Sequence, residues 1–164
     1  MEVTLKAIEE PARAILENLY TYYVYEFSQF MPWELDSSGQ YPFNRSSLDS
    51  YWQKPGYSPY FIYADGSLAG FVLLRPYPGA PQVNDIEQFF VLRRFKGKGV
   101  GKRAFATLVE RHPGPWQIRV LKENHGALNF WRSAVAAVAD GDFDERLDVD
   151  GDLEMVFLRF DKPA

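Results

Sequence analysis

The chain has 164 residues, 46% of them hydrophobic and 24% charged, which is an ordinary composition for a globular domain. It contains no run of about 20 apolar residues that could span a bilayer and no basic segment followed by an apolar one at its start, so we expect a cytoplasmic protein without a membrane span or secretory signal. The lack of cysteine excludes disulfides and thiolate ligands, and a net charge of −4 argues against nucleic acid as a partner.

The hydrophobic pattern predicts a mixed α/β domain, built on one central sheet, that uses residues 1–164 as a single unit. In its first half we expect a strand over 1–8, a helix opened by Pro11 that reaches Phe27, a loop over 31–43, a short helix from Asn44 or Ser46 to Trp52, and strands over 57–64 and 67–75. A loop over 76–81 follows, then a strand over 83–91, a helix ending near His112, a strand over 116–120, a helix over 124–137, and an antiparallel pair over 140–147 and 153–160. The expected order is β-α-α-β-β-β-α-β-α-β-β.

Three glycines at alternate positions separate the strand over 83–91 from the next helix, and six basic residues surround them between Arg93 and Arg103. The glycines are Gly97, Gly99 and Gly101. Glycine lets backbone N–H groups converge, and a helix N-terminus adds free N–H groups and a partial positive charge. This pattern predicts a site for a phosphate or pyrophosphate; the alternative is a tight turn with a solvated basic face. The spacing fits neither a Walker loop nor a dinucleotide fingerprint.

A second motif, Asn124-His125-Gly126-Ala127-Leu128-Asn129-Phe130-Trp131, follows the next strand. With the loop Lys96-Gly97-Lys98-Gly99-Val100-Gly101 it resembles the GNAT superfamily of N-acetyltransferases. Their pyrophosphate loop reads Arg/Gln-x-x-Gly-x-Gly/Ala, and their later motif reads Asn-x-x-Ala-x-x-Phe-Tyr. A loop register that begins at Arg94 also fits these letters. We prefer the register that begins at Lys96, because the preceding strand then ends, at Val91, at the family's usual distance from the loop. Residues 87–91 are most similar to the spermidine/spermine N-acetyltransferases.

The resemblance extends over nearly the whole chain. It implies an α/β fold of GNAT type, with a mixed, mostly antiparallel central sheet flanked by about four helices, and acetyl-CoA (coenzyme A) as cofactor. Val91 would hold the pantetheine arm through its backbone, and the Asn124 side chain would bond the arm, cap its helix, or do both. The residues expected at the cofactor are Phe89, Val91, Lys96, Gly97, Lys98, Gly99, Val100, Gly101, Lys102, Asn124, Phe130 and Trp131.

The implied reaction needs a group that removes a proton from an amine. An amine like that of lysine has a pKa of about 10.4, so at neutral pH it must lose a proton before it can attack a thioester. Glu87 matches the position of the base in polyamine acetyltransferases, and Asp85 matches the position used by histone-type members. Strand alternation places Asp85, Glu87, Phe89 and Val91 on one face. Glu87 is the expected base or proton relay, and Asp85 is the alternative.

Aromatic and acidic residues crowd the first third of the chain, which in this family forms a wall of the acceptor site. They are Tyr22, Tyr23, Tyr25, Glu26, Phe27, Trp33, Glu34, Asp36, Tyr41 and Trp52. Aromatic faces and carboxylates suit an amine or ammonium ligand, whereas many aromatic residues serve only as core or dimer interface. We expect a minority to reach the pocket, with Tyr25, Glu26 and Trp33 as substrate-binding residues.

Trp131 departs from the family pattern, in which a tyrosine at this position can protonate the leaving thiolate. An indole N–H donates hydrogen bonds but is not an acid near neutral pH. A thiol with a pKa of about 8.5 can leave as the thiolate, so water, a hydrogen bond, or a tyrosine from the first helices is expected to assist instead.

These observations predict an acyltransferase that moves an acetyl group from acetyl-CoA to a primary amine, by direct attack in a ternary complex. The expected acceptor is a small-molecule or peptide amine; no metal ion is expected, and the family's frequent dimers make a homodimer one expected assembly. Two alternatives stay open. The first is an acyl-CoA-binding or sensing module that has lost catalysis, and the second is a nucleic-acid-binding domain that uses the basic run from Arg93 to Arg103.

Overall fold

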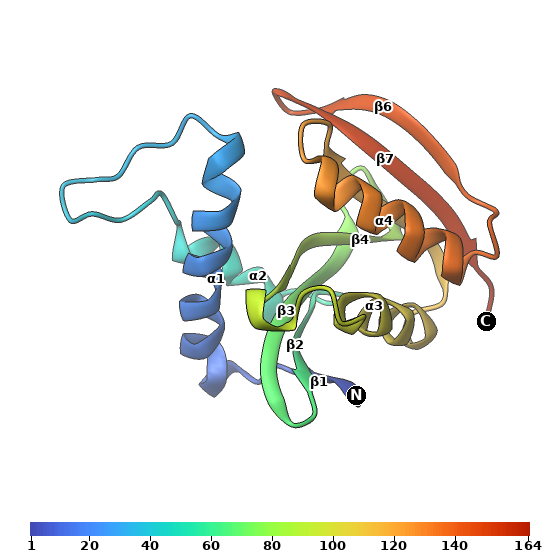
Figure 1. Ribbon diagram of the computed structural model, residues 1–164, viewed down its shortest axis with the longest axis horizontal. Coiled ribbons are helices and arrows are strands. Elements are labelled where there is room, and N and C mark those ends of the chain that lie inside the picture. The colour runs from blue at the N-terminus through green and yellow to red at the C-terminus, as the bar shows by residue number, and fades with distance from the viewer.

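The computed structural model describes residues 1–164 as a seven-stranded sheet with helices on both faces (Figure 1). The strands are β1 (Val3–Ala7), β2 (Ser58–Ala64), β3 (Ser67–Tyr77), β4 (Ala80–Val91), β5 (Gly114–Leu121), β6 (Asp144–Asp150) and β7 (Leu153–Lys162). The helices are α1 (Arg13–Phe27), α2 (Ser50–Gln53), α3 (Val100–Arg111) and α4 (His125–Val138). Short 3₁₀ turns lie at Glu10–Ala12, Ser28–Phe30, Arg45–Leu48 and Arg93–Phe95. The order of elements expected from the sequence is confirmed.

The sheet opens at its centre, between β4 and β5. Its strand order is β1-β2-β3-β4-β5-β7-β6, and β4–β5 is the only parallel pair. These two strands pair only at Asn84–Trp116 and Asp85–Gln117. Beyond Asp85 they diverge, so the second half of β4 has a strand partner on its β3 side alone. The divergence leaves the β5-side edge of residues 86–91 without a strand partner.

Each face of the sheet carries its own hydrophobic core. The larger core lies beneath α3 and α4, where Phe105 and Val135 pack on strand residues such as Val72 and Ile118. The smaller core lies beneath α1 and α2, where Leu16 packs with residues of β2 and β3. In Figure 1, α1 stands on one side of the sheet and α3 and α4 on the other. None of the helices combines the length and apolar character needed to cross a bilayer.

Two expected boundaries are wrong. Residues 76–81 are not a loop, because β3 continues to Tyr77, β4 begins at Ala80, and only Pro78 and Gly79 turn between them. The prolines in these strand ends are tolerated because β3 has no β2 partner beyond Leu74 and β4 has no β5 partner before Asn84. The last hairpin also begins later than expected, since β6 starts at Asp144.

A β-bulge interrupts the pairing of β3 with β4 at Glu87. Leu74 pairs with Ile86 and Leu73 pairs with Gln88, so Glu87 is an extra residue with no partner on β3. A bulge of this kind inserts one residue and shifts the alternation of side chains beyond it. The half of β4 that lies against the sheet opening therefore presents its side chains one step out of phase with the first half.

The bulge separates the carboxylates of β4 from its aromatic end. Phe89 and Val91 pack on the larger core, beneath α3 and α4. Glu87 accepts a hydrogen bond from Tyr51 of α2 on the opposite face, and Asp85 lies with it, since one arginine of β3 bonds both carboxylates. The expectation that Asp85, Glu87, Phe89 and Val91 share one face is therefore wrong, because simple alternation takes no account of the extra residue.

Candidate active site

The glycine-rich loop carries free backbone donors into α3. Gly99 caps this helix with a φ of 79°, a left-handed conformation that glycine adopts without strain. None of the backbone N–H groups of residues 97–102 donates to an acceptor in the protein. The last three belong to the first turn of the helix, where N–H groups lack intrahelical partners and the helix dipole is positive. The loop is thus a cradle for an anionic group such as a pyrophosphate.

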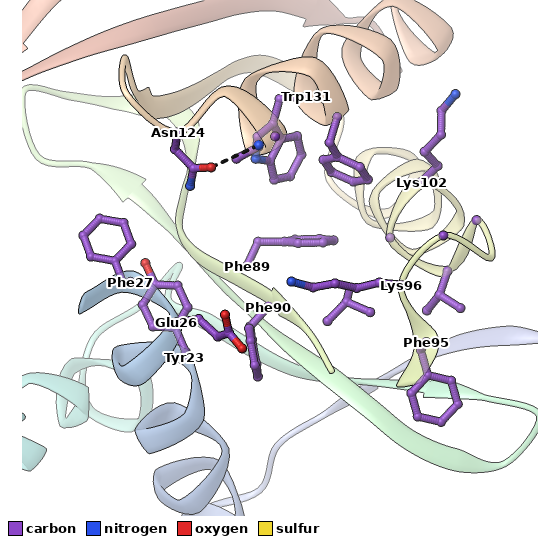
Figure 2. Close-up of a pocket in the computed structure, with 18 of the residues that line it drawn as sticks. Tyr23, Glu26, Phe27, Phe89, Phe90, Phe95, Lys96, Lys102, Asn124 and Trp131 are labelled. Atoms are coloured by element: carbon purple, nitrogen blue, oxygen red, sulfur yellow. Dashed lines mark hydrogen bonds between the residues drawn. The ribbon is translucent and has the colours of Figure 1, made fainter. Parts of the chain in front are cut away.

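A cavity of about 590 Å³ lies beside this cradle, and we call it the loop cavity (Figure 2). It is enclosed by the loop, the end of β4, the first turns of α4, and the last turn of α1. Its lining includes these residues expected at the cofactor: Phe89, Val91, Lys96, Gly97, Gly99, Val100, Gly101, Lys102, Asn124, Phe130 and Trp131. Lys98 is exposed and does not line it. The Lys96 side chain extends into the cavity alongside Phe89.

Asn124 lies at the start of α4 and lines the loop cavity. Its Oδ1 accepts a hydrogen bond of 3.1 Å from the backbone N–H of Ala127, which makes it the N-cap of α4. The amide nitrogen has no such role and points toward the cavity in Figure 2. The cap is therefore present, and the side chain keeps its donor end for a ligand.

A second cavity of about 470 Å³ adjoins the loop cavity at the sheet opening, and we call it the ion-pair cavity. Aromatic rings from α1 and the segment that follows it form one wall, namely Tyr20, Tyr23, Phe27, Trp33 and Phe43. Charged side chains from β3, β4, β5 and the end of β6 form a charged wall, namely Arg75, Glu87, Arg119 and Asp150. The wall of aromatic faces and the row of charges suit a ligand that carries an amine on an apolar body.

Glu87 has both carboxylate oxygens engaged yet remains accessible from the ion-pair cavity. The Tyr51 hydroxyl donates to Oε1 at 2.7 Å, and the Arg75 guanidinium donates to Oε2 at 2.8 Å. The side chain is 28% exposed. Burial, together with the neighbouring Glu87 carboxylate, raises the pKa of Tyr51 far above its usual value, so this hydroxyl stays protonated and holds the carboxylate in place.

Asp85 lies two residues before Glu87 on β4 and lines neither cavity. Its side chain is fully buried and accepts hydrogen bonds from Arg75 and Arg119, with Nε–O distances of 3.1 and 2.9 Å. Gln117 is also within hydrogen-bond distance, at 3.4 Å. Buried charges of this kind are stabilised by their partners, so the arrangement makes Asp85 the anchor of the two arginines.

The three residues expected to bind substrate lie in different places. Trp33 lines the ion-pair cavity. Glu26 lines the loop cavity instead, where it accepts a 2.6 Å hydrogen bond from Arg93. Tyr25 lines neither cavity; it is 62% exposed and its ring lies near that of Tyr41. The structure therefore does not bring these three residues together.

Sequence reasoning missed part of the charged wall. Arg119 comes from β5 and bonds Asp85, while Asp150 comes from the end of β6 and pairs with Arg119. Neither residue belongs to a motif. The only signal is that two polar residues, Gln117 and Arg119, alternate with apolar ones in this strand, which indicates buried partners but does not identify them.

The sequence matches the model of the acetyltransferase (GNAT) family over residues 16–134. A search against curated proteins finds no match. Among solved structures, an acetyltransferase from Thermus thermophilus has a TM-score of 0.71 at 12% identity, covering 98% of this chain and 97% of that one. A chimeric spermidine N-acetyltransferase from Vibrio cholerae has a TM-score of 0.66 at 14% identity, covering 98% and 96%.

A Bacillus anthracis protein, solved in complex with acetyl coenzyme A, has a TM-score of 0.60 at 16% identity and covers 98% of this chain and 99% of that one. At such identities the likeness shows the fold. The mixed, mostly antiparallel sheet with its four helices is the fold that the sequence motifs imply.

Proposed function

The chain belongs to the GNAT family of acetyltransferases, and from this premise we propose that residues 1–164 form one domain that transfers an acetyl group from acetyl-CoA to a primary amine, with both substrates bound together. The observation that carries this proposal is the pair of cavities that meet in the sheet opening. They share the lining residues Tyr23, Phe27, Phe89, Asn124, Ala127 and Trp131. A ligand in one cavity can therefore touch a ligand in the other.

The loop cavity fits coenzyme A. The free N–H groups of residues 97–102 would hold the pyrophosphate, with Lys96 and Lys102 adding positive charge. The unpaired edge of β4 near Val91 would bond the pantetheine arm as an added strand does, and the Asn124 amide nitrogen would donate to it. Phe89, Phe130 and Trp131 would form the apolar wall at the thioester end. When bound, acetyl-CoA supplies the activated acetyl group.

The ion-pair cavity would bind the acceptor. Its carboxylates are more accessible than its arginines: the side chains of Glu87 and Asp150 are 28% and 35% exposed, against 17% for Arg75 and 10% for Arg119. A cationic amine is therefore attracted to this wall, while the aromatic wall that includes Trp33 packs on its apolar part.

Glu87 would take the proton from the acceptor, directly or through one water. It is the accessible carboxylate on β4, and Tyr51 and Arg75 fix its orientation. Asp85 would act only through others, since it holds Arg75 and Arg119 from a fully buried position. A general base of this kind typically contributes about 10² to 10⁴ in rate.

Initial-rate kinetics test the proposal. Purified protein is offered acetyl-CoA and a panel of amines that includes polyamines, amino acids, aminoglycosides and peptides, and the release of coenzyme A is followed. With the best acceptor, double-reciprocal plots should intersect, because both substrates must be bound before reaction. Parallel plots would indicate a covalent acetyl-enzyme. Binding of acetyl-CoA without turnover of any amine would favour the sensing module instead.

A further inference from the structure

The junction of the two cavities holds a hydroxyl group without an assigned role. This inference rests on the proposed function, which brings a thioester from the loop cavity and an amine from the ion-pair cavity to the same place. The bond that breaks lies between the acetyl carbon and the sulfur of coenzyme A. Among the residues lining both cavities, Phe27, Phe89 and Ala127 are apolar. The side-chain donors are Tyr23, Asn124 and Trp131.

Tyr23 presents its hydroxyl to this junction. The hydroxyl is not hydrogen-bonded to any protein group, and its oxygen is not sealed in the core as an unpartnered buried atom. In Figure 2 the ring of Tyr23 rises from α1 beside Phe27, with its oxygen turned toward the open space below Asn124. A donor with no protein acceptor, facing a cavity, is available to a ligand.

Neighbouring rings hold Tyr23 in this orientation. Its centroid lies 5.5 Å from that of Tyr20 and 5.7 Å from that of Phe27. Phe71 and Phe90 of the sheet approach its ring in edge-to-face geometry, at 6.2 and 5.9 Å. Four aromatic contacts restrict the ring, so little conformational freedom is lost when the hydroxyl engages a ligand.

The hydroxyl stays protonated throughout the working range of pH. Burial raises the pKa of Tyr23 well above that of an ordinary tyrosine, and the nearby Tyr20 and Glu87 raise it further, against a smaller opposing effect of Arg119. A phenol in this state is a poor acid but a permanent hydrogen-bond donor. It can stabilise developing negative charge without giving up its proton.

We propose that the Tyr23 hydroxyl donates a hydrogen bond to the sulfur of coenzyme A as the carbon–sulfur bond breaks. The amine nitrogen forms its bond to the acetyl carbon, the carbon–sulfur bond breaks, and its electron pair remains on sulfur. The proton stays on Tyr23, the thiolate later takes a proton from water, and the protons of the amine leave through Glu87 to solvent. Tyr23 thus supports the departing thiolate in a chain that has Trp131 at the family's usual tyrosine position.

Binding measurements test this assignment independently of turnover. Calorimetry compares the affinities of coenzyme A and of desulfo-coenzyme A, in which hydrogen replaces the thiol, from about pH 7 to about pH 9.5, a range in which a thiol of ordinary pKa ionises. In the wild type, the preference for coenzyme A over desulfo-coenzyme A should rise with pH, because the thiolate accepts a hydrogen bond better than the thiol does. In Tyr23→Phe this rise should be smaller by about 10-fold or more, as expected for loss of a hydrogen bond to a charged group.

The fold should survive the substitution, because Tyr23→Phe removes an oxygen that has no partner in the protein. Thermal unfolding checks this, and Tyr22→Phe on the exposed side of the same helix is the matched control. In turnover, Tyr23→Phe should lower kcat by about 10- to 100-fold with little change in the KM of acetyl-CoA, and Tyr22→Phe should match the wild type.

Three outcomes would overturn the inference. An equal pH-dependent gain for coenzyme A in wild type and Tyr23→Phe would show that the hydroxyl does not contact the sulfur, even if the wild type acetylates amines normally. An unchanged kcat in folded Tyr23→Phe would lead to the same conclusion. Failure of the wild type to bind coenzyme A would instead contradict the proposed function, and the inference with it.

Discussion

A Cβ atom on Gly101 would lie 2.9 Å from Cζ of Phe130, closer than real Cβ contacts allow. The third glycine of the loop therefore leaves room for the Phe130 ring, which lines the loop cavity and would have to shift if a side chain were added at this position. We expect Gly101→Ala to push Phe130 toward the cofactor and weaken coenzyme A binding about 10-fold, in line with the usual effect of overpacking. Calorimetry measures the affinity, and an unchanged value would show that the ring relaxes away from the cavity.

Gly99 offers a test of the anion cradle that leaves packing untouched. A Cβ here would meet no atom within 4 Å, and its left-handed backbone is one that Asn and Asp tolerate better than other residues. Gly99→Asp should weaken coenzyme A binding at least about 10-fold more than Gly99→Asn, since only the first places a negative charge beside the pyrophosphate. Equal affinities in the two variants would contradict the cradle.

Glu87→Gln should reveal the proton acceptor through its dependence on pH. At neutral pH we expect kcat/KM to fall about 10²-fold or more, because the amine remains protonated without a base. The loss should shrink as the pH rises toward about 10.4, where an amine like that of lysine deprotonates unaided. Coenzyme A affinity should barely change. A loss of the same size at every pH would assign Glu87 to substrate positioning.

The main effect expected of Asp85→Asn is a lower free energy of unfolding. The substitution leaves Arg75 and Arg119 near a neutral group in a buried site, and breaking a buried pair in this way typically costs about 3 to 5 kcal/mol. Urea unfolding measures this loss, with Asp150→Asn as the comparison, because Asp150 is partly exposed and should cost less. A stability loss below that of Asp150→Asn would contradict the role of Asp85 as anchor of the arginines.

Trp131→Phe should leave most of the activity intact. Trp131 is buried, with edge-to-face contacts to Phe89, Phe105 and Phe130 at centroid distances of 5.0, 5.1 and 4.9 Å, so we assign it to the shape of the thioester pocket. Activity within about tenfold of wild type is expected, because general-acid roles are typically worth about 10² to 10⁴. A hundredfold loss with coenzyme A affinity intact would give the indole N–H the role that we assign to Tyr23.

The sequence predicted the secondary-structure elements and the glycine-rich loop before α3 because their signals are local. Alternation, turn residues and helix caps lie within a few positions of what they specify, as Asn124 does for α4. Most residues expected at the cofactor belong to two contiguous motifs, and the fold brings these motifs to the lining of one cavity. That they bind a cofactor stays a prediction.

The lining of the ion-pair cavity could not be predicted in the same way, because it depends on contacts between distant segments. The bulge at Glu87 arises from the pairing of β3 with β4. No residue type in the neighbouring sequence indicates that β4 contains an extra residue there. Tyr23 and Tyr25 lie two positions apart on α1, yet only Tyr23 faces the cavities, since the helix turns about 100° per residue. Arg119 and Asp150 meet only after β5, β6 and β7 have assembled.

The central claim, acetyl transfer between two ligands that meet at the junction of the cavities, is tested most directly by a mass balance on the wild-type protein. Acetyl-CoA and the best amine of the panel are incubated with the enzyme, and released coenzyme A and acetylated amine are quantified together by mass spectrometry. We predict one acetylated amine for each coenzyme A released, and no release beyond the uncatalysed rate when the amine is omitted. Release of coenzyme A without any acetylated amine would contradict the account.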